Sequence, residues 1–140
     1  MTRLQRMALV ALFALAFMVP AVAAPTPVPA TKTWSGSVEN AELQKLAPEG
    51  SVLVKAEDFE KLVKAWKVAD KAPPVDFDKE LVLVATSVGS RLSLKAMLDE
   101  KGDLTALGLG TRDFGPGFRY VIITVPRAGV KTVNGKPLPQ

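Results

Sequence analysis

The order of apolar and polar residues predicts a buried central strand at 81–85. Every residue from Leu81 to Ala85 is apolar, so both faces of a strand at this position would be apolar. Such a strand must be covered on both sides, which places it in the middle of a sheet with other structure on each face. A second apolar run, Tyr120 to Val125, also alternates little. We expect it to lie beside the first run in the interior of the sheet.

The segment from Glu57 to Lys67 has the period of an amphipathic helix. Its large apolar residues recur at the spacing i, i+3, i+4 and i+7, and they are Phe59, Leu62, Val63 and Trp66. Acidic residues stand at the start and lysines at the end, which complements the helix dipole. Trp66 could stack on a sugar or a base, but its place in the apolar stripe favours a role in core packing.

Shorter patterns predict the remaining elements. Asn40 can cap a brief helix over 41–46, and Asn134-Gly135 predicts a closing hairpin. Further strands are expected at 34–39, 51–55, 92–98 and 104–109. The turns between most of these strands are too short for crossovers, so an antiparallel arrangement is expected. The predicted fold is α+β, a mostly antiparallel sheet of about six or seven strands with one main amphipathic helix packed on it.

The first residues have the pattern of a secretion signal. Arg3 and Arg6 precede an uncharged, mostly apolar run from Met7 to Val19, and small residues follow. An uncleaved membrane anchor is the alternative, but this run is well short of the roughly 20 residues that cross a bilayer. We therefore expect residues 1–23 to be a signal peptide cleaved after Ala23, and the protein to be periplasmic or secreted. A flexible proline-rich leader at 24–33 would precede a single globular domain at 34–140.

Composition narrows the possible chemistry. The chain has no histidine and no cysteine, so thiol nucleophiles, imidazole bases and the usual zinc, copper and haem ligands are missing. Its formal charge of +4 falls to +2 without Arg3 and Arg6, and no block of like charge remains. We expect a protein that is not an enzyme and that has no cofactor. We also expect no nucleic-acid partner and no stable membrane insertion after signal cleavage.

Two weaker patterns keep other chemistries open. Asp76, Asp78 and Glu80 alternate before the central strand and could hold a hard cation. Calcium requires more oxygen ligands than three carboxylates supply, so a solvated strand entrance is the simpler interpretation. Ser93 and Lys95 could form a nucleophile and base pair, but no oxyanion hole or nucleophile elbow accompanies them.

The segment from Arg112 to Tyr120 is the best candidate for a binding surface. It combines arginines and aromatic residues with glycines and a proline, a mixture typical of binding hot spots. The candidate contact residues are Arg112, Asp113, Phe114, Phe118, Arg119 and Tyr120. In the alternative interpretation, Phe114 and Phe118 enter the core, while Arg112 and Asp113 pair at the surface.

Residues 57–127 resemble a known family, the C-terminal domain of the bacterial protease-complex subunit PrcB. The shared features are a helix carrying Trp66, the run from Pro74 to Val84, Gly89 and a late strand ending in Pro126-Arg127. Where that family has a Gly-Gly-Tyr-like turn, this chain has Ser90-Arg91-Leu92-Ser93. The resemblance implies an exported accessory domain without catalytic activity that docks onto or stabilises another exported protein. The alternative function is a small-ligand or carbohydrate-binding module that uses Trp34 or Trp66.

Overall fold

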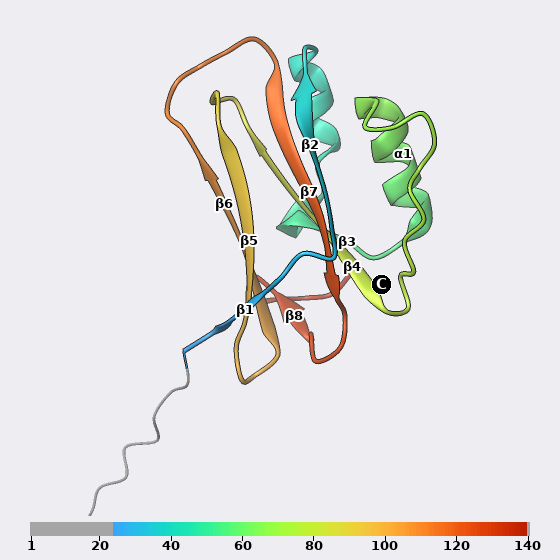
Figure 1. Ribbon diagram of the computed structural model, residues 1–140, viewed down its shortest axis with the longest axis vertical. Coiled ribbons are helices and arrows are strands. Elements are labelled where there is room, and N and C mark those ends of the chain that lie inside the picture. The colour runs from blue at the N-terminus through green and yellow to red at the C-terminus, as the bar shows by residue number, and fades with distance from the viewer. Residues whose placement is uncertain (1–23, 140) are drawn as a thin grey trace, which may run out of the picture.

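The computed structural model describes residues 24–139, which form two β-sheets and one main helix in three layers (Figure 1). A four-stranded sheet of order β2-β7-β4-β3 lies in the middle. Its strands are Lys32–Val38, Phe118–Pro126, Glu80–Ser87 and Val52–Leu53. Helix α1, Ala56–Trp66, covers one face together with the short helix η1, Ala41–Leu46. The short helix η2, Glu49–Ser51, leads into β3.

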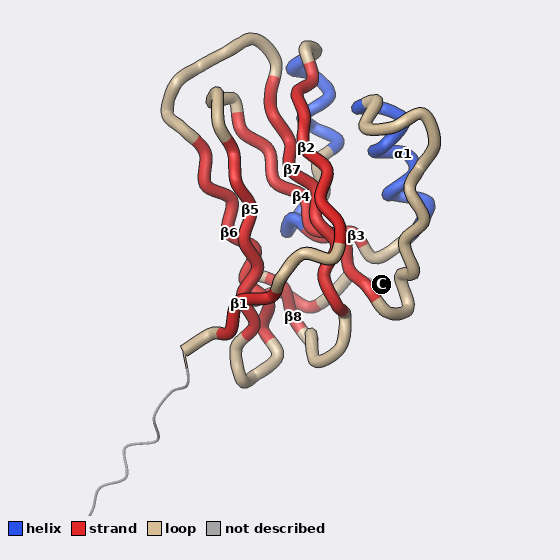
Figure 2. Tube along the Cα trace, viewed as in Figure 1, coloured by secondary structure: helices blue, strands red, loops and turns tan. Residues whose placement is uncertain are grey.

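The second sheet covers the other face of the middle sheet. It has five strands in the order β1-β5-β6-β8-β9. Their bounds are Thr26–Val28, Leu92–Leu98, Asp103–Gly110, Thr132–Val133 and Lys136–Pro137. Figure 2 shows the long β5-β6 hairpin lying over the middle sheet. All strand pairs are antiparallel except β6 with β8, which run parallel.

The central strand is confirmed as β4. Its residues Leu81 to Val84 are at most 2% exposed, and successive side chains enter two different cores. Leu81 and Leu83 pack against the five-stranded sheet, while Val82 and Val84 pack against the helix layer. As predicted, β7 is its neighbour, with Leu83 opposite Ile123. Burial on both faces is therefore why this run has no polar side.

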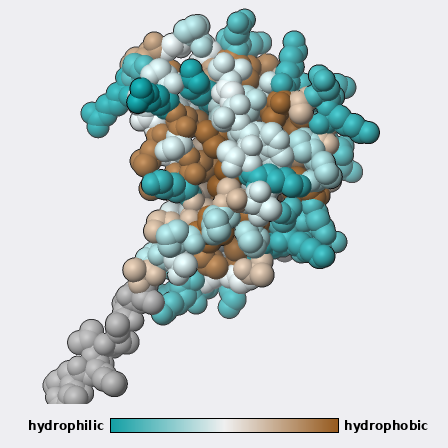
Figure 3. Space-filling model, in the orientation of Figure 1, coloured by the Kyte–Doolittle hydropathy of each residue, from teal (hydrophilic) through white to brown (hydrophobic). Residues whose placement is uncertain are grey.

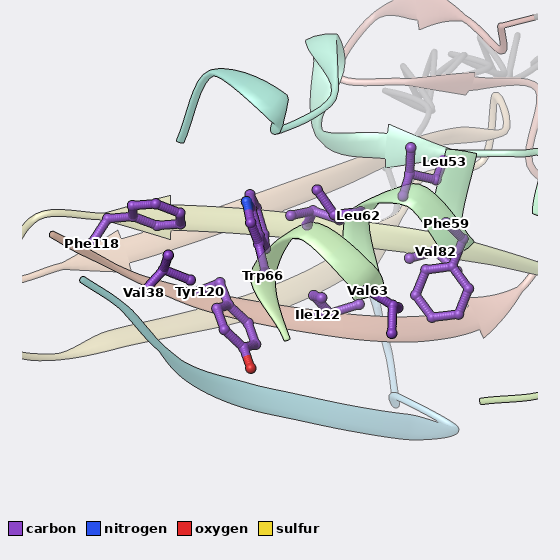
Figure 4. Packing of buried hydrophobic residues seen from close by; sticks show 11 residues of the cluster. Val38, Leu53, Phe59, Leu62, Val63, Trp66, Val82, Phe118, Tyr120 and Ile122 are labelled. Carbon is purple, nitrogen blue, oxygen red and sulfur yellow. The ribbon is translucent and has the colours of Figure 1, made fainter. Parts of the chain in front are cut away.

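The predicted helix stripe is also confirmed. Phe59, Leu62, Val63 and Trp66 are all buried on the middle sheet. Trp66 lies with its ring 5.2 Å from that of Phe118 and 5.4 Å from that of Tyr120, centroid to centroid (Figure 4). Its indole N–H donates a 2.8 Å hydrogen bond to the carbonyl of Leu43 in η1. The polar atom of this large side chain thus has a partner inside the core.

The short-range predictions agree with the structure in most places. Asn40 caps η1 by accepting a hydrogen bond from the Glu42 amide, and the hairpins at 99–102 and at Asn134-Gly135 form. The glycines of β6 allow a close approach to the middle sheet, since a Cβ at Gly108 would lie 3.2 Å from that of Ala85. The predicted six or seven mostly antiparallel strands are roughly consistent with the nine strands among the described residues. The single sheet is a correction, because these strands form two sheets.

The proline-rich leader is a second correction. Within the predicted flexible segment 24–33, Thr26–Val28 pairs with β5 as strand β1, and β2 already begins at Lys32. Pro27 is tolerated because β1 is an edge strand, where one side of the backbone needs no partner. The predicted signal peptide and its cleavage after Ala23 concern residues 1–23, which lie outside the described residues.

Asp103 joins the C-terminal strands to β6. Its Oδ1 accepts hydrogen bonds from the Thr132 hydroxyl at 2.6 Å and from the Gly135 amide at 2.8 Å. The Thr132 hydroxyl first, and then the Gly135 amide, hold the pKa of this carboxyl below its usual value. The ionised carboxylate is thus the form that fastens β8 and β9 to the rest of the sheet.

We expect Asp103→Asn to change the dependence of stability on pH. A carboxyl whose pKa is lower in the folded state stabilises the fold above its unfolded pKa, and this contribution is lost as the pH falls through the folded pKa. The difference in thermal midpoint between the original chain and Asp103→Asn should therefore shrink between about pH 5 and pH 2. Glu100→Gln, an exposed position in the preceding turn, is the control. A pH-independent difference would contradict the assigned role of the Asp103 charge.

Candidate functional site

The predicted binding segment lies at one end of the molecule, where two connections are bonded together. Residues 111–117 link β6 to β7, and residues 88–91 link β4 to β5 (Figure 1). The Gly115 amide donates to the carbonyl of Val88 at 3.1 Å, and the Thr111 amide donates to the carbonyl of Arg91, also at 3.1 Å. These bonds hold the longer connection against the shorter one.

The structure divides the six predicted contact residues into two groups. Phe118 and Tyr120, which are 2% and 6% exposed, belong to the core under α1, so they cannot meet a partner. Phe114 is 87% exposed, and Arg112, Asp113 and Arg119 are exposed as well. The core interpretation is therefore right for Phe118 and wrong for Phe114. Alternation along β7 explains Phe118 and Tyr120, since residues two apart share a face of the sheet.

Asp113 fixes the segment and does not pair with Arg112. Its Oδ1 accepts a 3.0 Å hydrogen bond from the Ser90 amide in the neighbouring connection. Hydrogen bonds from the Ser90 side chain, and next from Thr111, hold the pKa of this exposed carboxyl far below its usual value. Within residues 24–139 the only ion pair joins Lys45 to Glu42, so no carboxylate lies within 4.0 Å of either arginine of the segment.

Apolar side chains extend the exposed surface beyond the predicted segment. Val88, Leu107 and Leu109 are 37%, 44% and 52% exposed. Figure 3 shows apolar residues reaching the surface along β5 and β6, with hydrophilic side chains at the end of the molecule beyond them. Alternation in β6 could have indicated Leu107 and Leu109, because Leu104 and Ala106 fill the opposite face. No sequence signal marked Val88.

The two tryptophans offer little to a planar ligand. Trp66 is 3% exposed, so it cannot be a stacking platform. Trp34 is half-buried and packs on the helix core with its ring 5.9 Å from that of Phe59. For a carbohydrate-binding module, only the exposed part of the Trp34 ring would be available for stacking.

The predicted cation site is a turn in the structure. Asp76 Oδ1 accepts a hydrogen bond from the Asp78 amide, and the Asp76 carbonyl accepts from the amides of Lys79 and Glu80. The oxygens of Asp76 thus accept hydrogen bonds from backbone amides of the same segment, and the segment forms a turn and is not extended. Among residues 24–139, no three acidic side chains come close enough together to hold a metal ion. Ser93 and Lys95 lie on the exposed face of β5.

No helix in the described part of the chain is both long enough and apolar enough to cross a membrane. No protein-family model, curated protein or solved structure matches this chain. The assignment of a function therefore depends on the residues of the chain itself.

Proposed function

We propose that this chain is an exported, non-enzymatic domain that binds another exported protein through its loop end. The loop end is defined here as Val88, Arg112, Phe114 and Arg119. The observation that carries the proposal is Phe114, a phenylalanine 87% exposed in a connection that hydrogen bonds hold in place. Export rests on the signal pattern of residues 1–23. The resemblance to the PrcB domain supports a protease or another envelope protein as the partner.

The composition of the loop end fits a contact surface. Arginine and aromatic residues are enriched at the centres of protein interfaces, where they account for most of the binding energy. Covering an exposed aromatic ring with a partner removes apolar surface from water, which favours binding. The bonds from Asp113 to Ser90 and from Gly115 to Val88 already restrict the connection, so little conformational entropy remains to be lost on binding.

The double variant Arg112→Ala/Phe114→Ala should weaken binding of the partner at least tenfold, or about 1.4 kcal/mol. Its thermal midpoint should stay close to that of the original chain because both side chains are exposed. The measurement is affinity capture from the envelope fraction of the source cell, followed by titration of the captured protein once it is purified.

Leu46→Ala is the matched control for this experiment. Leu46 is 51% exposed in η1 and lies beside Pro48 and Leu53, so Leu46→Ala removes an exposed apolar side chain that is not part of the loop end. Capture of the same protein in equal amounts by all three chains would show that the contact lies outside Arg112 and Phe114. Unfolding of the double variant would show that the two side chains stabilise the fold.

A further inference from the structure

A cleft next to the loop end contains two arginines without acidic partners. It lies between β2, β7 and the start of β5, has a volume of about 530 Å³, and is lined in part by Ser35, Ser90, Arg91, Leu92 and Arg119. Arg119 shares a face of β7 with Val121, which packs toward the five-stranded sheet. Both arginines are exposed, and in residues 24–139 no carboxylate lies within 4.0 Å of either one.

The charge of this cleft is positive. The acidic group bonded to its lining is Asp113, whose carboxylate accepts from the Ser90 amide. The cleft therefore has two positively charged guanidinium groups and one negatively charged carboxylate. Guanidinium groups bind carboxylates through paired N–H donors, and two of them around one cleft favour an anionic ligand.

An unpaired strand edge begins at the same cleft, where Leu92 is one of the lining residues. Strand β1 pairs with β5 only from Ala96 to Leu98, so no strand covers residues 92–95 on that side. Just before β5, the Thr111 amide donates to the Arg91 carbonyl, so the backbone of Arg91 faces the side on which β6 lies. Because backbone groups alternate in direction along an antiparallel strand, Leu92 and Leu94 direct theirs toward the open edge. Such an edge is a template for an added strand.

We propose that this cleft binds an extended acidic segment of the partner protein. The segment adds to the open edge of β5 and places a carboxylate between Arg91 and Arg119. A peptide fits better than a small inorganic anion because the cleft is much larger than one anion, and because only a peptide can satisfy the alternating backbone groups of Leu92 and Leu94. The inference rests on the proposed interaction function and specifies the chemistry of the partner.

The test uses a rhodamine-labelled peptide of about eight alternating glutamate and valine residues, the length of an ordinary strand. Fluorescence anisotropy should show binding to the purified chain that weakens as salt is added. The same peptide with glutamine in place of glutamate should bind at least tenfold more weakly. Arg91→Gln and Arg119→Gln should each weaken binding of the acidic peptide at least tenfold. Lys136→Gln removes the same charge from β9 and should leave the affinity within about twofold.

Amide hydrogen exchange tests the added strand separately. The amides of Leu92 and Leu94 should become protected when the acidic peptide is present, while those of exposed turn residues at 99–102 should not change. Absence of binding up to about 1 mM, equal binding of the glutamine peptide, or full affinity in both arginine variants would overturn the proposal. Displacement of the peptide by micromolar inorganic phosphate would overturn the peptide assignment in favour of a small-anion site.

Failure here is distinguishable from failure of the proposed function. If the partner is captured through Arg112 and Phe114 but Arg91→Gln captures and binds it equally well, the interaction function stands and the cleft proposal falls. If the original chain captures no partner, the interaction function fails, while the peptide titration still decides whether the cleft binds an acidic strand.

Discussion

Replacing Trp66 by alanine is expected to destabilise the domain by about 3 to 5 kcal/mol. The indole ring is 3% exposed and contacts the rings of Phe118 and Tyr120 between α1 and the middle sheet (Figure 4). Its removal leaves a cavity under the helix and leaves the Leu43 carbonyl without the indole donor. Urea unfolding followed by far-ultraviolet circular dichroism measures the loss.

Two substitutions separate the contributions of Trp66. Trp66→Phe keeps an aromatic ring but has no N–H for Leu43, so it should cost less than alanine. Trp34→Ala removes a half-buried ring from the same core and should also cost less. A loss below about 1 kcal/mol for Trp66→Ala would mean that the ring is at the surface, contrary to the structure.

Gly117→Ala is expected to be the second severe substitution, with a loss of about 2 to 5 kcal/mol. Gly117 has φ +70°, a left-handed conformation that costs other residues about 1 to 2 kcal/mol. In addition, a Cβ here would overlap the Val38 carbonyl oxygen and lie 2.8 Å from the Glu39 Cα. Because these are backbone atoms at the end of β2, the end of β2 and the connection at 111–117 would have to move apart.

Two other glycines provide matched controls for Gly117. Gly50 has the same φ of +70°, but nothing lies within 4 Å of its added Cβ, so Gly50→Ala measures the conformational cost alone. Gly115 is in the same connection and its added Cβ would meet only the Val88 oxygen at 3.9 Å, so Gly115→Ala should be nearly neutral. If Gly117→Ala costs no more than Gly50→Ala in chemical denaturation, the close contact with β2 is not tight in solution.

The sequence was sufficient for elements whose pattern repeats locally. The apolar run at Leu81 to Ala85, the stripe ending at Trp66 and the turn at Asn134-Gly135 each carry their periodicity or turn chemistry within a few residues. The division into two sheets could not be predicted in this way. It depends on which strand edges meet, and the pairing of β6 with β8 joins segments about thirty residues apart.

The candidate site was predicted in part for a related reason. Composition identified Arg112 and Phe114, but it cannot state which aromatic side chain enters a core, because that depends on the register of β7 beside β2 and β4. Phe118 and Tyr120 lie on the helix face of β7, whereas Arg119 lies on the opposite face. The cleft was not predicted either, since Arg91 is in the connection before β5 and Arg119 is in β7, and only the tertiary fold brings them together.

The place of β7 in the middle sheet determines when the domain can fold. This strand comes late in the chain, yet it lies between β2 and β4, and Lys32 bonds to Thr124 across 92 residues. Contacts between distant segments form only after a large loop has closed. The entropy lost in closing the loop comes before the contacts stabilise the fold, and this slows folding. Until β7 is available, β2 and β4 have no common neighbour and the middle sheet cannot form. The middle sheet is therefore complete only when the chain up to Pro126, the last residue of β7, is available for pairing.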